Sequence, residues 1–224
     1  MISILFSKIR HKLIHFFLKK FYGLLYHEFA WAYDFVAWLV SWGQWRNWTQ
    51  SILQFIKGTS VLELGHGPGH LANAMDPTIT YFGIDQSRQM SRIAQRNANR
   101  HSSRLNWIRA EAENIPFVNH SFETVIATFP SEYIFQPATL KSCSRILKPD
   151  GELIILLGVK FTSANFSSRI LKTIYDLFQQ SPPNDQFWEQ IQGQFLSHGL
   201  NPKLDFLDFK TYQLIFVRAK PMWN

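Results

Sequence analysis

The sequence predicts an α/β fold with a doubly wound, mostly parallel sheet, and three observations point to this class. An apolar strand pattern at 60–65 runs directly into a glycine-rich turn. Further strand patterns then alternate with helical patterns along the chain. Two more strand patterns, 202–209 and 212–219, follow as a closing hairpin. Because parallel strands need right-handed crossovers, the alternation places helices on both faces of one sheet.

The expected elements follow in order along the chain. Apolar runs predict the strands, and amphipathic runs between them predict the helices. A longer helical region at 164–198 is broken by Ser181-Pro-Pro-Asn-Asp185, so it is expected to form one or two helices. The strands before it are expected at 60–65, 79–84, 104–109, 122–128 and 150–158, and the helices at 68–76, 87–100 and 137–147.

The turn after the first strand, Gly65-His-Gly-Pro-Gly69, has the composition of a ligand-binding loop. Its three glycines permit positive φ and remove Cβ atoms that would hold a ligand away from the backbone, and Pro68 suits the opening of a helix. Asp85 ends the second strand, where a carboxylate can accept hydrogen bonds from two ribose hydroxyls. The sequence therefore predicts a nucleotide-type site at the carboxyl edge of the sheet.

Glu63 lies inside the first, otherwise apolar strand and needs a partner. A cationic ligand amine or backbone N–H groups near the turn would supply one. The turn reads G-x-G-x-G rather than G-x-G-x-x-G, and Glu63 stands two residues before its first glycine. A fold that holds a pyrophosphate at this place has no use for an acid so close to it, which disfavours a dinucleotide site.

Glu63 and the glycine-rich turn Gly65–Gly69 resemble the first motif, E/D-x-G-x-G-x-G, of the class I S-adenosylmethionine-dependent methyltransferases. Three further family motifs have similar segments in this chain, and they occur in family order. They are the second strand with its final acid, Arg109-Ala-Glu-Ala-Glu-Asn-Ile-Pro-Phe117, and the turn Ile146-Leu-Lys-Pro-Asp-Gly-Glu-Leu153. The resemblance spans about residues 60 to 158. It implies a Rossmann-like seven-stranded sheet with one antiparallel strand, and S-adenosyl-L-methionine as cofactor.

The resemblance also implies which residues bind the cofactor. Asp85 is expected at the ribose, Glu111 with the Ala112 N–H at the adenine, and Gln86 and Met90 beside that ring. The family usually has Asp at the position of Glu111, so Glu113 or a plain exposed loop stays open there. For Asp85 the alternative is a helix cap, for which Ser87 is the better candidate. The full expected set is Glu63, Gly65, His66, Gly67, Gly69, Asp85, Gln86, Met90, Glu111, Ala112 and Thr128.

Candidates for acid–base work fall into two groups, and no single general base stands out. Thr128-Phe-Pro-Ser-Glu-Tyr133 follows the fourth strand and lacks the N/D-P-P-Y/F pattern of amide-type N-methyltransferases, which disfavours those substrates. Glu132 and Tyr133 are candidates there, with a plain loop role as the alternative. The other candidates are His27, Tyr33, Asp34 and His66, for which core packing or an exposed position in the turn is the competing interpretation.

The amino-terminal 58 residues form a basic and aromatic extension. They carry seven Lys and Arg against two acids, or +5 of the +7 net charge, and five of the eight tryptophans. Residues 1–21 fit an amphipathic helix with Lys8, Lys12 and Lys19 on its polar face. Three roles stay open for that helix: contact with a membrane interface, a cap over the substrate pocket, or a homodimer contact. The expected division is 1–58 as extension and 59–224 as the methyltransferase domain.

The single cysteine, Cys143, excludes a disulfide framework and a multi-thiolate metal site, and no metal is expected. It is expected to pack in the helix before the fifth strand. The sequence has no apolar run long enough to span a bilayer. A cytoplasmic protein, in contact with the inner face of the membrane if residues 1–21 bind lipid, is the expected location.

The leading functional hypothesis is methyl transfer to a lipophilic small molecule such as a quinone precursor, a phenolic or a lipid headgroup. Two alternatives stay open: a nucleic-acid methyltransferase, suggested by the net charge, and a non-catalytic adaptor that keeps the cofactor. The acceptor, the methylated atom and the oligomeric state are left open.

Overall fold

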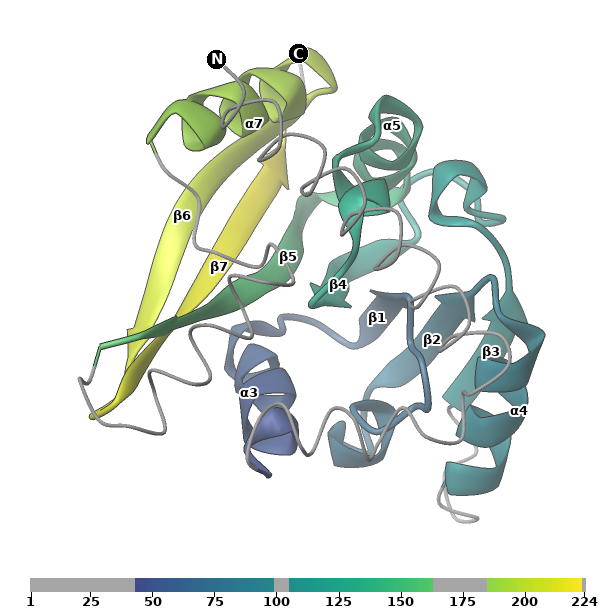
Figure 1. Ribbon diagram of the computed structural model, residues 1–224. Coiled ribbons are helices and arrows are strands. Elements are labelled where there is room, and N and C mark those ends of the chain that lie inside the picture. The colour runs from purple at the N-terminus through teal and green to yellow at the C-terminus, as the bar shows by residue number, and fades with distance from the viewer. Residues whose placement is uncertain (1–42, 99–104, 163–184, 223–224) are drawn as a thin grey trace, which may run out of the picture.

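The computed structural model describes residues 43–98, 105–162 and 185–222, and all structural statements below concern these ranges. They form one seven-stranded sheet in the order β3-β2-β1-β4-β5-β7-β6 (Figure 1). The strands are β1 (Ser60–Leu64), β2 (Thr80–Asp85), β3 (Leu105–Arg109), β4 (Phe122–Thr128), β5 (Leu147–Phe161), β6 (Leu200–Asp208) and β7 (Tyr212–Pro221).

The directions of the strands confirm the predicted doubly wound sheet. The first five strands pair in parallel, whereas β7 is antiparallel to both β5 and β6. The hairpin β6–β7 therefore inserts its second strand between β5 and β6. This is the mostly parallel sheet with one antiparallel strand that the sequence predicted.

Helices cover both faces of the sheet, and two of them begin at a recognisable local signal. Helix α4 (Arg88–Asn97) is capped by Ser87, whose hydroxyl accepts a hydrogen bond from the Met90 N–H at 3.3 Å. Helix α5 (Pro137–Ile146) has proline in its first turn, where the missing N–H costs nothing. The remaining helices are α3 (Trp45–Gln50), which continues into a 3-10 helix at Ser51–Phe55, and α7 (Asp185–Ser197).

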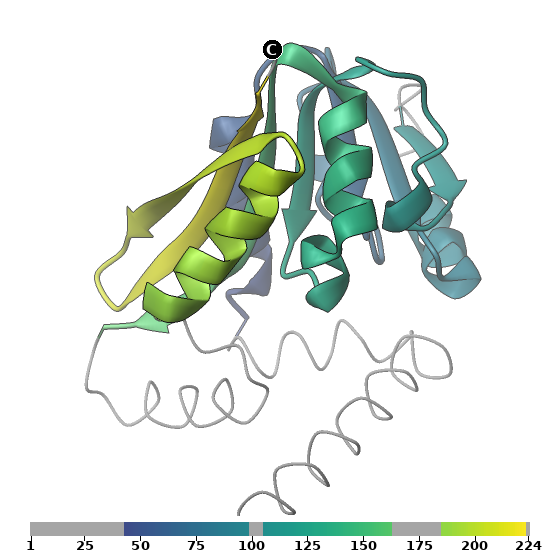
Figure 2. The same cartoon turned by 90° about the horizontal axis from the view of Figure 1, so that it is seen from above.

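Two apolar cores follow from the period-two alternation of the buried strands. Val125 and Ala127 of β4 point into the core under α5 and α7, while Ile126 between them points into the core that contains Trp48 of α3. Figure 2 shows α5 and α7 together on one face of the sheet and α3 on the other. Cys143 lies fully buried in α5, as expected, and burial raises the pKa of its thiol to about 12.

One predicted helix, 68–76, is wrong. After the glycine turn the chain forms only a 3-10 helix at Ala72–Ala74, and Met75 is already extended. Gly69 has a φ of 77°, which a right-handed helix cannot accommodate, and Pro77 follows shortly after the 3-10 helix. The apolar residues that suggested a helix, among them Leu71 and Ala72, are buried from this short turn instead.

The remaining boundaries differ little from expectation. Strand β5 is longer than predicted at both ends, beginning at Leu147 and continuing to Phe161. The part of the amino-terminal extension within the described residues, from residue 43 onward, packs against the sheet: Trp48 and Ile52 are buried beside Ile126 and Ile154. Expected features at 1–42, 99–104 and 163–184 lie outside the described residues, including the amphipathic helix 1–21.

Candidate cofactor and acceptor site

The candidate site lies at the edge where β1, β2 and β4 end. Strands β1 and β2 run side by side, with Leu64 opposite Ile84, so the turn after β1 meets Asp85 at the end of β2. Gly65, Gly67 and Gly69 have φ values of 69°, 51° and 77°. Other residue types rarely adopt this region, so the backbone path of the turn depends on glycine at all three positions.

The three glycines leave space for different neighbours. A Cβ on residue 65 would lie 2.8 Å from the Tyr133 hydroxyl, and a Cβ on residue 69 would lie 2.7 Å from the Trp107 ring and 2.9 Å from the Ala94 Cβ. A Cβ on residue 67 would meet no atom within 4 Å. Gly65 and Gly69 thus make room for protein side chains, and only the surface over Gly67 is open to a ligand.

Asp85 is tied to this turn by its own carboxylate. Its Oδ2 accepts a hydrogen bond from the Gly67 N–H at 3.0 Å, and its Oδ1 accepts one from the Ser87 N–H at 2.8 Å. Each carboxylate oxygen has a second acceptor position, so these bonds leave capacity for hydroxyl donors. Asp85 is half-buried, and it is Ser87 that caps α4, as predicted.

Glu63 has a partner that the sequence did not indicate. Its carboxyl is 2% exposed and accepts a hydrogen bond from the hydroxyl of Tyr81, which is also buried, on the neighbouring strand. Burial raises the pKa of Glu63 to about 8, with the nearby Asp85 charge adding to the rise and the Tyr81 hydrogen bond opposing it. The Tyr81 hydroxyl is thus a hydrogen-bond partner of Glu63 within the sheet.

His66 lies beneath the turn rather than on its surface. It is 4% exposed, its Nδ1 is 2.7 Å from the Gly67 carbonyl oxygen, and its ring meets the Trp107 ring edge-on at 4.7 Å. Burial lowers the pKa of this histidine, an effect that the Asp85 charge opposes. The alternative of an exposed turn side chain is thereby wrong.

The residues expected around an adenine ring lie at different depths. Gln86 and Glu111 are exposed and Ala112 is half-buried. The Gln86 carbonyl accepts a hydrogen bond from Arg109 Nε at 3.0 Å, which holds the end of β2 to the end of β3. Met90, by contrast, is fully buried within α4. Of these four residues, Gln86 and Glu111 are therefore the ones exposed to solvent.

The segment after β4 borders the same edge. Tyr133 reaches across to β1, where its hydroxyl donates to the Leu64 carbonyl at 3.2 Å, while Glu132 is exposed and Thr128 is half-buried. Phe129 has a φ of 46°, unusual for a residue other than glycine, and its ring stacks on Trp45 at 4.5 Å. Strained backbone of this kind concentrates at functional sites.

Other candidates do not join this group within the described part of the chain. His27, Tyr33 and Asp34 lie outside the described residues. Where the structure is described, His, Cys, Asp and Glu side chains form no group of three that could hold a metal ion. No helix in the same ranges is long and apolar enough to cross a membrane.

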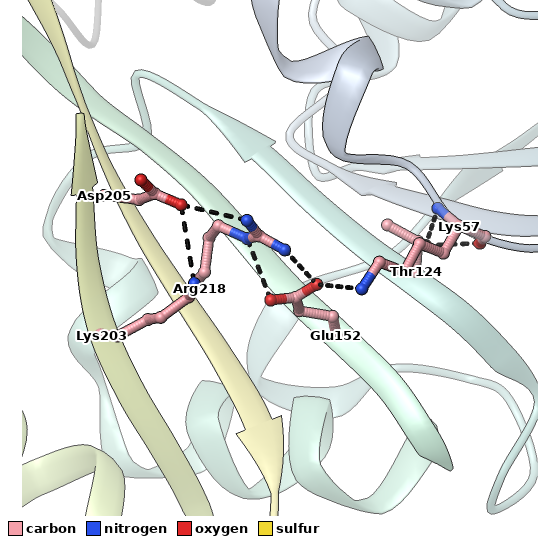
Figure 3. A network of polar contacts seen from close by, with 6 residues as sticks. All are labelled: Lys57, Thr124, Glu152, Lys203, Asp205 and Arg218. Carbon is pink, nitrogen blue, oxygen red and sulfur yellow. Dashed lines mark hydrogen bonds and ion pairs between the residues drawn. The ribbon is translucent and has the colours of Figure 1, made fainter. Parts of the chain in front are cut away.

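A second polar group, unforeseen from the sequence, extends across β5, β7 and β6 (Figure 3). Arg218 of β7 donates to both carboxylate oxygens of Glu152 on β5, at 2.9 and 2.8 Å, and to Asp205 on β6 at 3.0 Å. Lys57 lies 3.8 Å from Glu152 and Lys203 3.7 Å from Asp205. This network joins three strands and belongs to the architecture rather than to the site.

Comparisons with known proteins agree with this geometry. Residues 61–151 match the model of a family described as "Methyltransferase domain". The chain is 29% identical over 167 residues to a ubiquinone/menaquinone biosynthesis C-methyltransferase from Blochmanniella floridana, covering 69% of this chain and 63% of the relative. It is 26% identical over 159 residues to a demethylmenaquinone methyltransferase from Thermotoga maritima, covering 68% of each.

A solved structure shares the fold. A phosphoethanolamine N-methyltransferase of Haemonchus contortus, bound to S-adenosylhomocysteine, superposes with a TM-score of 0.58 at 17% identity, over 81% of this chain and 53% of that one. The chain spans less than two thirds of the length of the Blochmanniella relative. The family match over residues 61–151, the strand order and the glycine turn together support the resemblance to the class I S-adenosylmethionine-dependent methyltransferases that the sequence motifs indicated.

Proposed function

We propose that this protein transfers a methyl group from S-adenosyl-L-methionine to a lipophilic small molecule of the quinone-precursor class. The proposal that the cofactor binds here rests on the open surface over Gly67 beside the half-buried Asp85. An acid at that place suits the two ribose hydroxyls, and the missing Cβ lets the ligand approach the backbone. The names of two relatives, a ubiquinone/menaquinone biosynthesis C-methyltransferase and a demethylmenaquinone methyltransferase, support the acceptor class.

The chemistry asks little of the protein beyond alignment. The cofactor supplies an activated methyl group whose bond to sulfur breaks as the bond to the acceptor forms, and the acceptor loses a proton. The protein must bring donor and acceptor into line and exclude water. The candidates for contact with the acceptor or for taking its proton are Glu132, Tyr133, His27, Tyr33 and Asp34, whereas His66 is buried beneath the turn.

The remaining cofactor assignments belong to the same proposal. Gln86, Glu111 and Ala112 would border the adenine at the solvent-facing side of Asp85, and Thr128 would lie between donor and acceptor. Met90 would support this wall from within the core, since its side chain is fully buried. Glu63 would act from beneath the turn, through the hydrogen bond with Tyr81.

The decisive experiment determines which molecules receive a labelled methyl group. The full chain is incubated with methyl-labelled S-adenosylmethionine and a demethylated quinone in detergent micelles, and in parallel with a cell extract that is then separated into lipid, protein and nucleic-acid fractions. Label in the quinone and lipid fraction is the expected result. The Asp85→Asn variant is the control that should lose most of the signal, whereas Asp150→Asn, an exposed acid at the start of β5, should keep it.

Other outcomes would favour the alternatives. Label in RNA or DNA, together with nucleic-acid binding that weakens steeply with salt, would replace this proposal with a nucleic-acid methyltransferase. Tight cofactor binding with label in no fraction would indicate a non-catalytic adaptor. Failure to bind the cofactor at all would reject every version of the proposal.

We further propose that residues 1–21 bring the protein to the inner face of the membrane. Their basic amphipathic pattern supports this, since each lysine near anionic lipid contributes about 1 kcal/mol and apolar insertion adds to it. The full chain should sediment with vesicles of anionic lipid, and the combined change of Lys8, Lys12 and Lys19 to Gln should release it. If the chain bound zwitterionic vesicles equally well, or bound no vesicles, the membrane role of residues 1–21 would be rejected. The pocket cap and the homodimer contact would then remain, and cross-linking and sedimentation velocity would distinguish them.

A further inference from the structure

His66 occupies a space that the sheet leaves open for it. Glu63 of β1, Gly83 of β2 and Trp107 of β3 are paired in one row across the sheet. A Cβ on residue 83 would lie 2.9 Å from the Tyr81 hydroxyl and 3.1 Å from the Cβ and Cδ2 of His66. Because Gly83 has no side chain, the imidazole of His66 and the hydroxyl of Tyr81 both fit above the strand.

The hydrogen bonds of His66 define its protonation. Its Nδ1 is 2.7 Å from a carbonyl oxygen, which can only accept, so Nδ1 carries a hydrogen. Its Nε2 is buried and has no hydrogen-bond partner among the described residues. A second hydrogen on Nε2 would be a buried, unpaired donor on a cation, which is costly. His66 is therefore a neutral imidazole that donates from Nδ1.

Gly67 is consequently held on both sides of its backbone by side chains. Its carbonyl accepts from His66, and its N–H donates to Asp85 at 3.0 Å. These two contacts fix a residue whose φ of 51° lies in a region that glycine enters and leaves easily. They also set the carboxylate of Asp85 relative to the open surface over Gly67.

We propose that His66 is a positioning residue for the cofactor: by holding the Gly67 carbonyl from beneath, it fixes the turn in the conformation that directs the Gly67 N–H to Asp85 and keeps the ligand surface formed. This inference rests on the proposed function, because the ligand of that surface is the methyl donor. His66 itself acts from below the turn, through Gly67.

Acid weakens this arrangement. The titratable groups around His66 are Asp85 and Tyr81 from β2 and, through Tyr81, Glu63 from β1, while β3 contributes the neutral Trp107. Burial lowers the pKa of His66 below its ordinary 6.5, so the neutral form persists into mildly acidic solution. Once protonated, the ring carries a buried Nε2–H without an acceptor, and the turn loosens.

The test compares two replacements that differ in one donor. His66→Asn keeps an N–H close to the place of Nδ1, whereas His66→Leu fills the space without a donor. His198→Leu is the matched control, since His198 Nδ1 also meets a backbone carbonyl, that of Gln194 at 2.8 Å, close to the end of α7. The measurements are the affinity for S-adenosylhomocysteine by calorimetry, the exchange rate of the Gly67 amide hydrogen, and the unfolding midpoint.

His66→Leu should weaken S-adenosylhomocysteine binding about tenfold and speed exchange of the Gly67 amide by a similar factor, as expected for the loss of one buried hydrogen bond. His66→Asn should stay within about threefold of the wild type in both, and His198→Leu should change neither. The wild type should lose affinity as the pH falls below 6.5, while His66→Asn, which retains Asp85 and Glu63, should lose less.

The possible failures are distinguishable. Equal affinities and equal amide exchange in the Leu and Asn variants, at whatever unfolding midpoint, would overturn the positioning role and leave His66 as packing. A wild-type protein that binds no S-adenosylhomocysteine would reject the proposed function, yet the exchange of Gly67 in the three variants would still decide whether His66 holds the turn.

Discussion

The N–H of Gly67 donates to Asp85 Oδ2 at 3.0 Å, so the acid that ends β2 is hydrogen-bonded to the glycine turn that ends β1. The two halves of the motif, 18 residues apart in the sequence, are thus joined by a hydrogen bond within the protein. A ligand that contacts Asp85 meets a carboxylate whose position is already fixed, which reduces the ordering cost of binding.

Replacing Asp85 tests this unit directly. Asp85→Asn removes the negative charge and leaves an N–H₂ group facing one of the two backbone donors, Gly67 or Ser87. We expect affinity for S-adenosylhomocysteine to fall by about 10- to 100-fold, the range for hydrogen bonds to a charged group. Calorimetry checks this, with Asp150→Asn as the control. An unchanged affinity would place the ligand elsewhere.

Substitutions of two glycines in the turn should affect stability and ligand affinity differently. Gly69→Ala combines a φ of 77° with contacts under 3 Å to Trp107 and Ala94, so we expect a loss of about 3 kcal/mol in the free energy of unfolding. Gly67→Ala adds only backbone strain, about 1 kcal/mol, because its Cβ meets no protein atom. Denaturant titration and calorimetry together should show Gly67→Ala as the variant that folds but binds poorly. If it bound as tightly as the wild type, the open surface would not be the ligand's.

Glu63 should make stability depend on pH in an unusual direction. Its pKa is about 8 in the folded protein, above the ordinary 4.5, so the folded state holds the proton more tightly than the unfolded chain does. Its contribution to stability is complete below pH 4.5, declines between 4.5 and 8, and stays lost above 8. Relative to Glu63→Gln, which mimics the neutral acid, the wild type should become less stable from pH 5 to 8 in denaturant titrations. A constant difference between the two proteins across that range would mean that Glu63 does not titrate there.

The network around Arg218 should carry more stability than its exposed members suggest. Glu152→Gln leaves the guanidinium of Arg218, 12% exposed, without its bidentate partner, and we expect a loss of about 3 kcal/mol. Lys203→Ala removes a 62% exposed ammonium and should change stability by less than about 0.5 kcal/mol. Chemical denaturation of both variants measures the difference. Equal effects would show that burial does not set the strength of this network.

The order of the elements was predictable because it depends on local patterns. Apolar strands such as Phe122–Thr128 and the capped helix after Ser87 carry their signals within a few residues. The helix expected at 68–76 failed because two competing signals occupy the same stretch. Apolar residues at 71 and 72 favour a helix, whereas positive φ at Gly69 requires a turn, and the turn prevailed.

The site residues that belong to a sequence motif were predictable. The contacts that depend on strand register were not. Asp85 and the glycines follow from spacing alone. The partners of Glu63 and His66 depend on the pairing of residue 63 with 83 and of 83 with 107, which places Tyr81 and Trp107 on the same face of the sheet. The pair Glu152–Arg218, 66 residues apart, likewise depends on the antiparallel register of β5 and β7. A single sequence does not fix such registers.

The insertion of β7 between β5 and β6 has a consequence for biosynthesis. Among the described strands, β6 hydrogen-bonds only to β7, so during translation it has no place in this sheet until residues 212–221 have left the ribosome. Until then the nascent chain presents the open edge of β5, an apolar strand that other polypeptides can pair with. Chaperone protection should therefore matter most in the interval between the emergence of β5 and that of β7.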